Sequence, residues 1–195
     1  ISIRTLVGYH SDWINEVNAV YVKDIVADAK NSVSEEAKKI KGIFKNMKFD
    51  VIIGNPPYQA PTNKKTVSGQ QPVQNIFQYF QELADNMNAD YSSLIYPGKR
   101  WIHQSGKGLR KFGKELINDP HLAKLILFED SNQVFSDVSI ADGISIVFKD
   151  YNKKSDGFIY DFIAKDGKEF KDIPVKNPGN KLLIVDPRDM SIANA

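Results

Sequence analysis

A short apolar run that ends in glycine and continues into two prolines constrains the fold of this chain more than any other feature. The run Phe49-Asp50-Val51-Ile52-Ile53-Gly54 is rich in β-branched residues and predicts a buried strand. The turn Asn55-Pro56-Pro57-Tyr58 follows directly, and its prolines fix φ and favour extended geometry in the residue before them. The turn therefore lies at the carboxyl end of a strand, where open α/β sheets bind their ligands.

The residue types of this turn suit an acceptor that is planar and weakly nucleophilic. The side-chain oxygen of Asn55 and the backbone carbonyl of Pro56 can each accept one N–H of an exocyclic amino group, such as that of adenine. Accepting both hydrogens favours a more tetrahedral nitrogen, aimed at an electrophilic methyl group. Tyr58 offers a flat face for stacking a base, which must first leave its duplex. The alternative is an ordinary turn, because Asn and Pro are common turn residues.

Alternating helical and strand patterns around the turn predict a mainly parallel, layered α/β sheet. Residues 11–46 have helical spacing, with Ser11 as an N-cap and a capping box from Ser32 to Glu35, although residues 20–26 also suit a strand. The polar stretch 59–72 predicts a mobile loop beside the turn. Further helices are expected at residues 73–87 and 107–118, and further strands at residues 93–96, 124–128 and 144–148.

The pattern of apolar residues changes after Asp150. Two short alternating runs, at residues 158–163 and 182–185, are separated by Gly, Pro, Asn and Lys and predict a separate β-rich element. The chain thus divides into a helical segment 1–48, a central segment 49–150 that carries the turn, and a β-rich extension 151–195. Because the chain opens with Ile1 rather than Met, we expect it to be a piece of a larger protein.

The composition excludes several kinds of protein. No apolar stretch is long enough to cross a bilayer and no signal peptide opens the chain, so we expect a cytoplasmic protein with no membrane partner. With no cysteine and three scattered histidines, we expect no metal site. The net charge of +2 is only weakly basic.

One segment is strongly basic in spite of this balance. Six basic residues and no acidic residue lie between Lys99 and Lys114. Such a cluster predicts phosphate contacts or, alternatively, a solvated loop and helix face. The candidate contacts to a nucleic-acid backbone are Lys99, Arg100, Lys107, Arg110 and Lys111.

Residues 49–58 resemble the catalytic motif of amino-group methyltransferases that use S-adenosyl-L-methionine. These enzymes act on adenine in DNA, on adenine in RNA or on protein glutamine. Further segments, at residues 77–80, 94–97, 107–110, 133–140 and 143–148, resemble the large type IIG-like restriction-modification methylases, which modify adenine and are often fused to nuclease domains. This resemblance covers about residues 49–150 and implies that Phe135, together with Tyr58, contacts the flipped base. A core position is the alternative for Phe135. Trp101 and His103 could also contact nucleic acid, although loop packing is the simpler interpretation.

The sequence departs from the family in the part that holds the cofactor. The family has a glycine-rich turn before the catalytic motif, whereas Gly8 and Gly42 are the only glycines before Asp50, and Gly106 and Gly108 are expected to lie in a loop. We therefore expect a partial methyltransferase fold whose first strands are missing and which is inactive alone. Its unpaired sheet edge and apolar face favour self-association.

The resemblance implies a fragment of an N6-adenine DNA methyltransferase of a restriction-modification system. It would transfer methyl from S-adenosyl-L-methionine to an adenine flipped out of double-stranded DNA, with the catalytic residues Asn55, Pro56, Pro57 and Tyr58. Residues 151–195 would begin a target-recognition or linker region, and the parent protein could carry fused nuclease and specificity domains. The alternatives are a methyltransferase for RNA adenine or protein glutamine, and a catalytically silent DNA-binding or specificity module.

Overall fold

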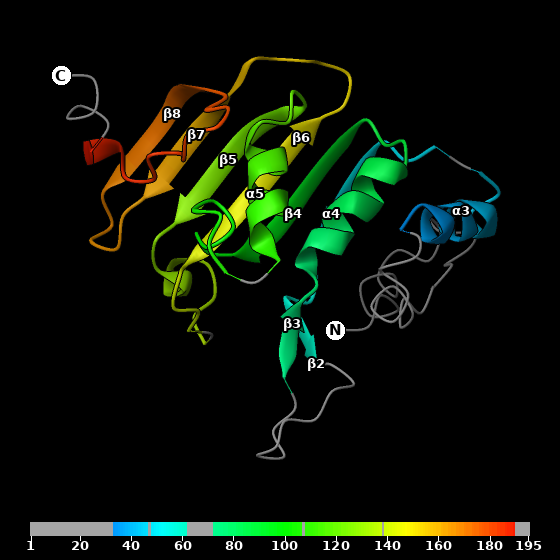
Figure 1. Ribbon diagram of the computed structural model, residues 1–195, viewed down its shortest axis with the longest axis horizontal. Coiled ribbons are helices and arrows are strands. Elements are labelled where there is room, and N and C mark those ends of the chain that lie inside the picture. The colour runs from blue at the N-terminus through cyan, green and yellow to red at the C-terminus, as the bar shows by residue number, and fades with distance from the viewer. Residues whose placement is uncertain (1–32, 47, 62–71, 107, 138, 190–195) are drawn as a thin grey trace, which may run out of the picture.

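The computed structural model describes residues 33–46, 48–61, 72–106, 108–137 and 139–189. Six strands form one sheet in the order β1-β4-β6-β5-β7-β8, and β2 and β3 form a separate two-stranded ribbon (Figure 1). The helical elements are α3 (Val33–Ile43), α4 (Phe77–Asn86), α5 (Leu109–Ile117) and the 3-10 turn η2 (Ser131–Gln133). The strands are β1 (Val51–Gly54), β2 (Gln59–Pro61), β3 (Val73–Asn75), β4 (Tyr91–Pro97), β5 (Leu122–Phe128), β6 (Ile144–Asp150), β7 (Gly157–Ile163) and β8 (Glu169–Lys176).

The large sheet is mixed, but most of its strands point the same way. β1 is parallel to β4, and β5 is parallel to β7. β6 lies between β4 and β5 and is antiparallel to both, and β8 is antiparallel to β7. Consequently β1, β4, β5 and β7 share one direction, while β6 and β8 run the other way. The prediction of an α/β fold built on a mainly parallel sheet, with β strands after Asp150, is confirmed.

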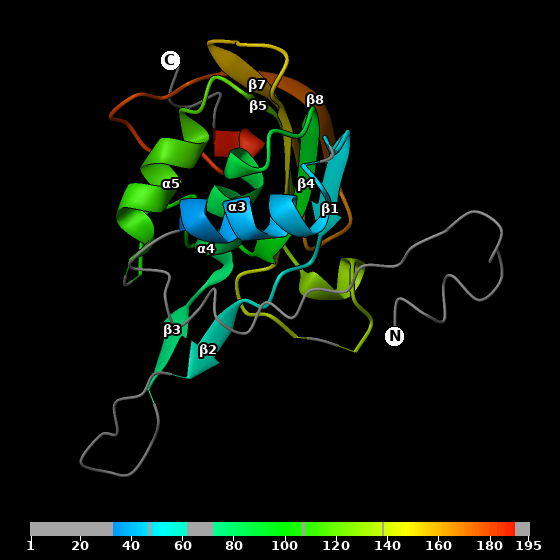
Figure 2. The same ribbon diagram turned by 90° about the vertical axis from the view of Figure 1, so that its right-hand side faces the viewer.

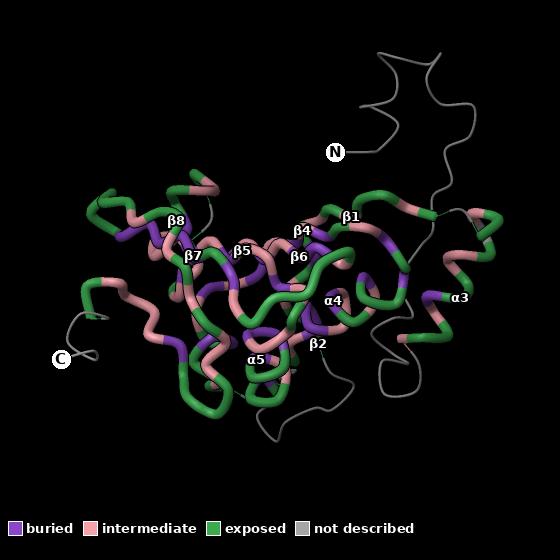
Figure 3. The backbone as a smooth tube through the Cα atoms, turned by 90° about the horizontal axis from the view of Figure 1, so that it is seen from above, coloured by how far each residue is buried: buried purple, intermediate pink, exposed green. Residues whose placement is uncertain are grey.

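The helices α4 and α5 cover one face of this sheet (Figure 2). Their apolar residues recur at helical spacing, and the buried positions of α5, Leu109, Gly113, Leu116 and Ile117, lie on one side of the helix. They pack on the alternate residues of the strands that point toward them, so the buried segments lie in the strands and on the adjoining helices (Figure 3). This layer holds the hydrophobic core.

The strand β1 is an edge strand rather than the buried strand that its apolar sequence predicts. Among the described residues it pairs only with β4. The side chain of Ile53 is 77% exposed and that of Val51 is 52% exposed. The prediction of burial was wrong because burial depends on the neighbours of a strand, which its own residues do not reveal. The turn 55–58 nevertheless follows the carboxyl end of this strand, as predicted.

The polar stretch after the turn, predicted as a loop, begins with a strand of a β-ribbon. Residues 59–61 pair with residues 73–75 in an antiparallel ladder, so the helix predicted from residue 73 begins only at Phe77. The backbone N–H of Ile76 donates to the carbonyl of Tyr58 at 3.0 Å, which ties the ribbon to the turn. The long-range pairing outweighs the helical spacing of residues 73–76. The tip of the predicted loop lies outside the described residues.

The segment after Asp150 does not form a separate element. β7 pairs with β5 and β8 pairs with β7, so both strands extend the same sheet. Residues 182–185 were predicted as a strand but are irregular. They are held by other contacts: Leu183 packs into the core, and the carbonyl of Val185 accepts a hydrogen bond from the Tyr160 hydroxyl at 2.7 Å. The proposed division into segments 1–48, 49–150 and 151–195 stays a prediction.

At the other end of the described chain, α3 packs against α4. Ala37 of α3 is buried, and Phe44, which follows this helix, contacts the ring of Phe49 edge to face at 5.2 Å. The other predictions for residues 1–32, which include both N-terminal caps and the possible strand at 20–26, lie outside the described residues. No helix in the described part of the chain is long and apolar enough to span a bilayer.

Candidate functional site

The turn after β1 presents its residues alternately to the surface and to the interior. Asn55 and Pro57 are exposed, Pro56 is buried and Tyr58 is half-buried against the hydrophobic core. The two prolines hold this conformation because they fix φ. The Asn55 amide therefore stands at the surface of the carboxyl edge of the sheet, where it is free to meet a ligand.

A pocket of about 290 Å³ joins the turn to a distant loop of the chain. Asn55, Pro56, Pro57 and Tyr58 line one side, and Phe135 and Ile140 line the other. Phe135 belongs to residues 129–143, which connect β5 to β6. All the residues predicted as catalytic or base-binding thus line one pocket, which we call the turn pocket. The roles of these residues stay predictions.

A second pocket, of about 360 Å³, lies on the other side of Asn55 and Pro56. Its walls come from α3, α4 and β1, and its lining residues are apolar except for Asn55. We call it the helix pocket. Sequence reasoning missed it, although the apolar spacings Ile40 to Phe44 and Phe80 to Ala84 mark helix faces that turn toward one space. Because Asn55 and Pro56 line both pockets, a group in one pocket can approach a group in the other at these two residues.

The side chain of Tyr58 is oriented with its polar end inside the protein. The hydroxyl is buried and has no hydrogen-bond partner among the described residues. Burial raises the pKa of Tyr58 above its usual value, so the phenol stays protonated at neutral pH. Tyr58 is therefore unsuited to accept a proton, and its ring is the part that a ligand in the turn pocket can contact.

The basic segment is less positive in the fold than in the sequence, because acidic residues pair with it, two from other segments and one from the next turn of α5. Lys99 lies 3.5 Å from Glu129, Arg100 lies 2.5 Å from Asp142, and Lys111 lies 3.7 Å from Glu115. Arg110 is exposed on the first turn of α5, without a recorded ion pair to any described residue. Lys107 lies outside the described residues. Contact of this segment with phosphate stays a prediction.

Two aromatic residues of the same segment have different surroundings. Trp101 is fully buried, and its ring N–H donates to the hydroxyl of Ser145 at 2.9 Å. Loop packing is therefore the correct interpretation for Trp101. His103 is exposed on the turn that follows.

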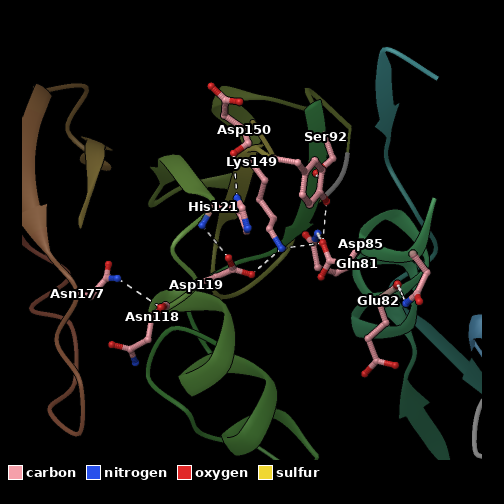
Figure 4. A network of polar contacts seen from close by, with 12 residues as sticks. Gln81, Glu82, Asp85, Ser92, Asn118, Asp119, His121, Lys149, Asp150 and Asn177 are labelled. Carbon is pink, nitrogen blue, oxygen red and sulfur yellow. Dashed lines mark hydrogen bonds and ion pairs between the residues drawn. The ribbon is translucent and has the colours of Figure 1, made fainter. Parts of the chain in front are cut away.

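A network of polar contacts lies at the end of the sheet where the parallel strands β4 and β5 begin, opposite the turn 55–58 (Figure 4). The ammonium of Lys149, whose side chain is 2% exposed, lies 2.7 Å from both Asp85 and Asp119. The Tyr151 hydroxyl donates to Asp85 at 2.7 Å, and burial, together with Asp85, raises the pKa of Tyr151. This network connects α4, the end of α5 and β6 away from both pockets, and we assign it a role in stability.

The family model of the Eco57I restriction-modification methylase matches residues 1–135. An uncharacterized adenine-specific methylase of Mycoplasma pneumoniae is 30% identical over 125 residues, which are 64% of this chain and 29% of that protein. The chain thus spans less than a third of the length of this relative.

Two solved structures have a distant likeness to the chain. One is the methyltransferase subunit of the type I restriction-modification system of Streptococcus thermophilus, with 15% identity and a TM-score of 0.43 over 76% of this chain and 31% of that one. The other is a chain of a type I restriction-modification system, with 14% identity and a TM-score of 0.44 over 69% of this chain and 29% of that one. The family match covers more than two thirds of the sequence, and the chain belongs to the Eco57I restriction-modification methylase family.

Proposed function

We propose that this chain carries the target-base half of a site-specific DNA adenine-N6 methyltransferase of a restriction-modification system. The observation that carries the proposal is the turn pocket, which places Phe135 across from the turn 55–58 although the two are about 80 residues apart in the sequence. Membership of the methylase family supplies the reaction class. The adenine-specific methylase of Mycoplasma pneumoniae supports adenine as the acceptor.

The described residues can bind and orient a flipped adenine. Tyr58 and Phe135 would hold the planar base between them, as aromatic side chains do for extruded bases. The exposed amide oxygen of Asn55 and the carbonyl of Pro56 would accept the two hydrogens of N6, which directs the nitrogen lone pair toward the side that Asn55 shares with the helix pocket. One of these hydrogens is later lost to water, because neither oxygen is a strong base.

The described residues fit S-adenosyl-L-methionine only in part. When bound, it supplies an electrophilic methyl group on a sulfonium. The helix pocket could surround apolar parts of such a molecule beside Asn55 and Pro56. The described residues that line it include no acidic side chain to bind ribose hydroxyls and no basic one for the carboxylate. We therefore propose that upstream parts of the parent protein complete the cofactor site and that this chain is inactive alone.

The same proposal extends to partners and location. Double-stranded DNA would lie across the carboxyl edge of the sheet, with its phosphates near Lys99, Arg100, Arg110 and Lys111. Specificity and nuclease domains could be fused to this chain in the parent protein, which would act in the cytoplasm, where its DNA is.

Methyl transfer from tritiated S-adenosyl-L-methionine to unmethylated DNA tests the proposal. The chain is compared with the parent polypeptide that extends upstream. Label in adenine with the longer polypeptide supports the proposal, and its absence from this chain supports the incomplete cofactor site. If neither polypeptide transfers label but both bind DNA in a salt-dependent way, the silent binding module is correct instead. Label in RNA or in protein glutamine would assign the other acceptors.

The substitution Asn55→Ala in the parent protein tests the role of the turn itself. It removes one of the two acceptors for N6, an interaction that strengthens in the transition state, so we expect turnover to fall by about 10²-fold or more. Binding of DNA should change little, because Asn55 contacts one amino group only. Asn55→Asp is the matched control, since it keeps an acceptor oxygen at the same position. Equal turnover in the wild type and in Asn55→Ala would refute the proposed mechanism.

A further inference from the structure

Phe135 and Ile140 form the wall of the turn pocket that faces the turn 55–58. Ser131 does not line the pocket, but it makes a hydrogen bond to each of these two residues. Its hydroxyl accepts a hydrogen bond from the backbone N–H of Ile140 at 2.8 Å. Its carbonyl accepts a hydrogen bond from the backbone N–H of Phe135 at 2.8 Å. Ser131 is 1% exposed, so both contacts are made inside the protein. One residue thus holds both ends of the segment 135–140.

The support behind Ser131 is tied to the sheet. The N–H of Glu129 donates to the carbonyl of Ile163 in β7 at 2.9 Å, and the side chain of Gln133 donates to the carbonyl of Ala164 at 2.9 Å. Asp130 caps η2 by accepting from the N–H of Asn132 at 2.9 Å. Ser131 therefore lies between Glu129 and Gln133, which are both hydrogen-bonded to β7 or the residue after it. Residues 135–140, which we call the wall segment, have fewer contacts.

The wall segment depends on these hydrogen bonds for its position. Phe135 and Ile140 are half-buried, and residues 136, 137 and 139 between them are exposed. Apolar packing among the described residues of this segment is therefore limited. The remaining contact at its far end is the N–H of Gly143, which donates to the carbonyl of Ile140 at 3.0 Å. Loss of the Ser131 hydroxyl would free the N–H of Ile140 and loosen the wall relative to Tyr58.

We propose that Ser131 is a positioning residue for the base pocket: its hydroxyl and carbonyl hold Ile140 and Phe135 at the separation from Tyr58 that a flipped base requires. The inference rests on the proposed function, and it assigns a buried polar residue that the proposed chemistry does not use. A base held on both faces tolerates little displacement of either wall. Ser131 touches neither the base nor the methyl donor, so it acts only through Phe135 and Ile140.

The test uses the parent protein and DNA that carries 2-aminopurine at the target adenine, because the fluorescence of this base rises when it leaves the stack. We expect Ser131→Ala to weaken retention of the flipped base about tenfold, the order of effect of one lost hydrogen bond. Ser92→Ala is the matched control. Ser92 is also fully buried, and its hydroxyl lies 3.0 Å from that of Tyr151, at the opposite edge of the sheet. Ser92→Ala should leave the fluorescence signal unchanged.

A double substitution separates positioning from a general loss of stability. Ser131→Ala removes the hydroxyl that accepts from Ile140, so the double variant Ser131→Ala with Ile140→Ala should lose no more signal than Ile140→Ala alone. Additive losses, or equal effects of Ser131→Ala and Ser92→Ala, would overturn the inference. Should Ser131→Ala fail to fold, hydrogen exchange of the wild type decides, because the Ile140 amide must be protected if it donates to a buried hydroxyl. Fast exchange at Ile140 would overturn the inference.

The outcome for the wild type separates this inference from the proposed function. A wild-type parent protein that neither methylates adenine nor raises the fluorescence of the target base would overturn the proposed function, and this inference with it. A wild type that does both, combined with an unaffected Ser131→Ala variant, would overturn only the role of Ser131.

Discussion

The hydroxyl and the ring of Tyr58 lie in different surroundings. The hydroxyl is buried without a partner among the described residues, and the ring lines the pocket. We expect Tyr58→Phe to keep kcat/KM within about twofold, because it removes a polar group that makes no hydrogen bond to any described residue. Tyr58→Ala removes the ring, and loss of base stacking should cost about 1–3 kcal/mol of target-base retention. Steady-state methylation and the fluorescence of 2-aminopurine DNA measure the two effects.

The same pair of variants also tests the protonation state of Tyr58. Since burial raises the pKa of this residue, the phenol is neutral throughout the working range and the pH profile of Tyr58→Phe should match that of the wild type. A loss of turnover in Tyr58→Phe as large as that in Tyr58→Ala would mean that the hydroxyl takes part in the reaction. The ring would then not be the only functional part of this residue.

Among the elements, α5 approaches the segment after β4 so closely that only glycine fits at the contact. A Cβ at Gly113 would lie 1.8 Å from the carbonyl oxygen of Trp101. Gly113→Ala should therefore lower the free energy of unfolding by about 1–3 kcal/mol, although alanine favours helix. Outside the backbone of its own helix, no described residue comes within 4 Å of a Cβ at Gly42 in α3, so Gly42→Ala should raise the free energy of unfolding by up to about 1 kcal/mol. Urea unfolding of both variants measures the difference, and the same sign for both would contradict this packing.

The contact between α4, the end of α5 and β6 depends on one buried cation. Lys149→Met leaves Asp85 and Asp119 without their shared partner. We expect the free energy of unfolding to fall by about 3 kcal/mol, which is the low end of the range for breaking a buried ion pair, because both carboxylates reach water. Lys48 makes an ion pair of the same length, 2.7 Å, with Asp90, but it lies at the surface. Lys48→Met should therefore have a much smaller effect. Equal losses in the two variants would show that burial does not determine the strength of this network.

For the whole molecule, the open edge at β1 is the feature with the largest consequence. Val51 is 52% exposed on this edge, and no described strand pairs with its outer side. Exposed apolar edges favour pairing with another chain, whereas lysine on an edge prevents it. We expect the chain to self-associate with rising concentration, and Val51→Lys to shift it toward the monomer in sedimentation velocity experiments.

Leu182→Lys is the control for this experiment, since Leu182 is 56% exposed and follows β8 at the far side of the sheet. It should leave the association unchanged. A wild-type chain that sediments as a monomer at every concentration would contradict the prediction, and an equal effect of both lysines would point to charge rather than to the β1 edge.

Local sequence was enough to predict the features that depend on a few neighbouring residues. Pro56 and Pro57 fix φ and so favour a turn whatever the rest of the chain does. The helical spacing of Leu109, Leu116 and Ile117 defines the buried face of α5. The resemblance of residues 49–58 to a methyltransferase motif, which led to the methylase family, also follows from this short range. The strand β2 was wrongly predicted as part of a loop and β8 was not predicted, since their residues are polar or alternate with charges.

Only the tertiary structure decided which of these local features meet. It brought Phe135 and Ile140 to the turn 55–58, paired the basic segment with Glu129 and Asp142, and left β1 at an edge. Each of these outcomes depends on contacts between residues far apart in the chain, and such contacts leave no periodic mark in a single sequence. The turn pocket is the clearest case, because Phe135 and the turn 55–58 come together only when the sheet has formed.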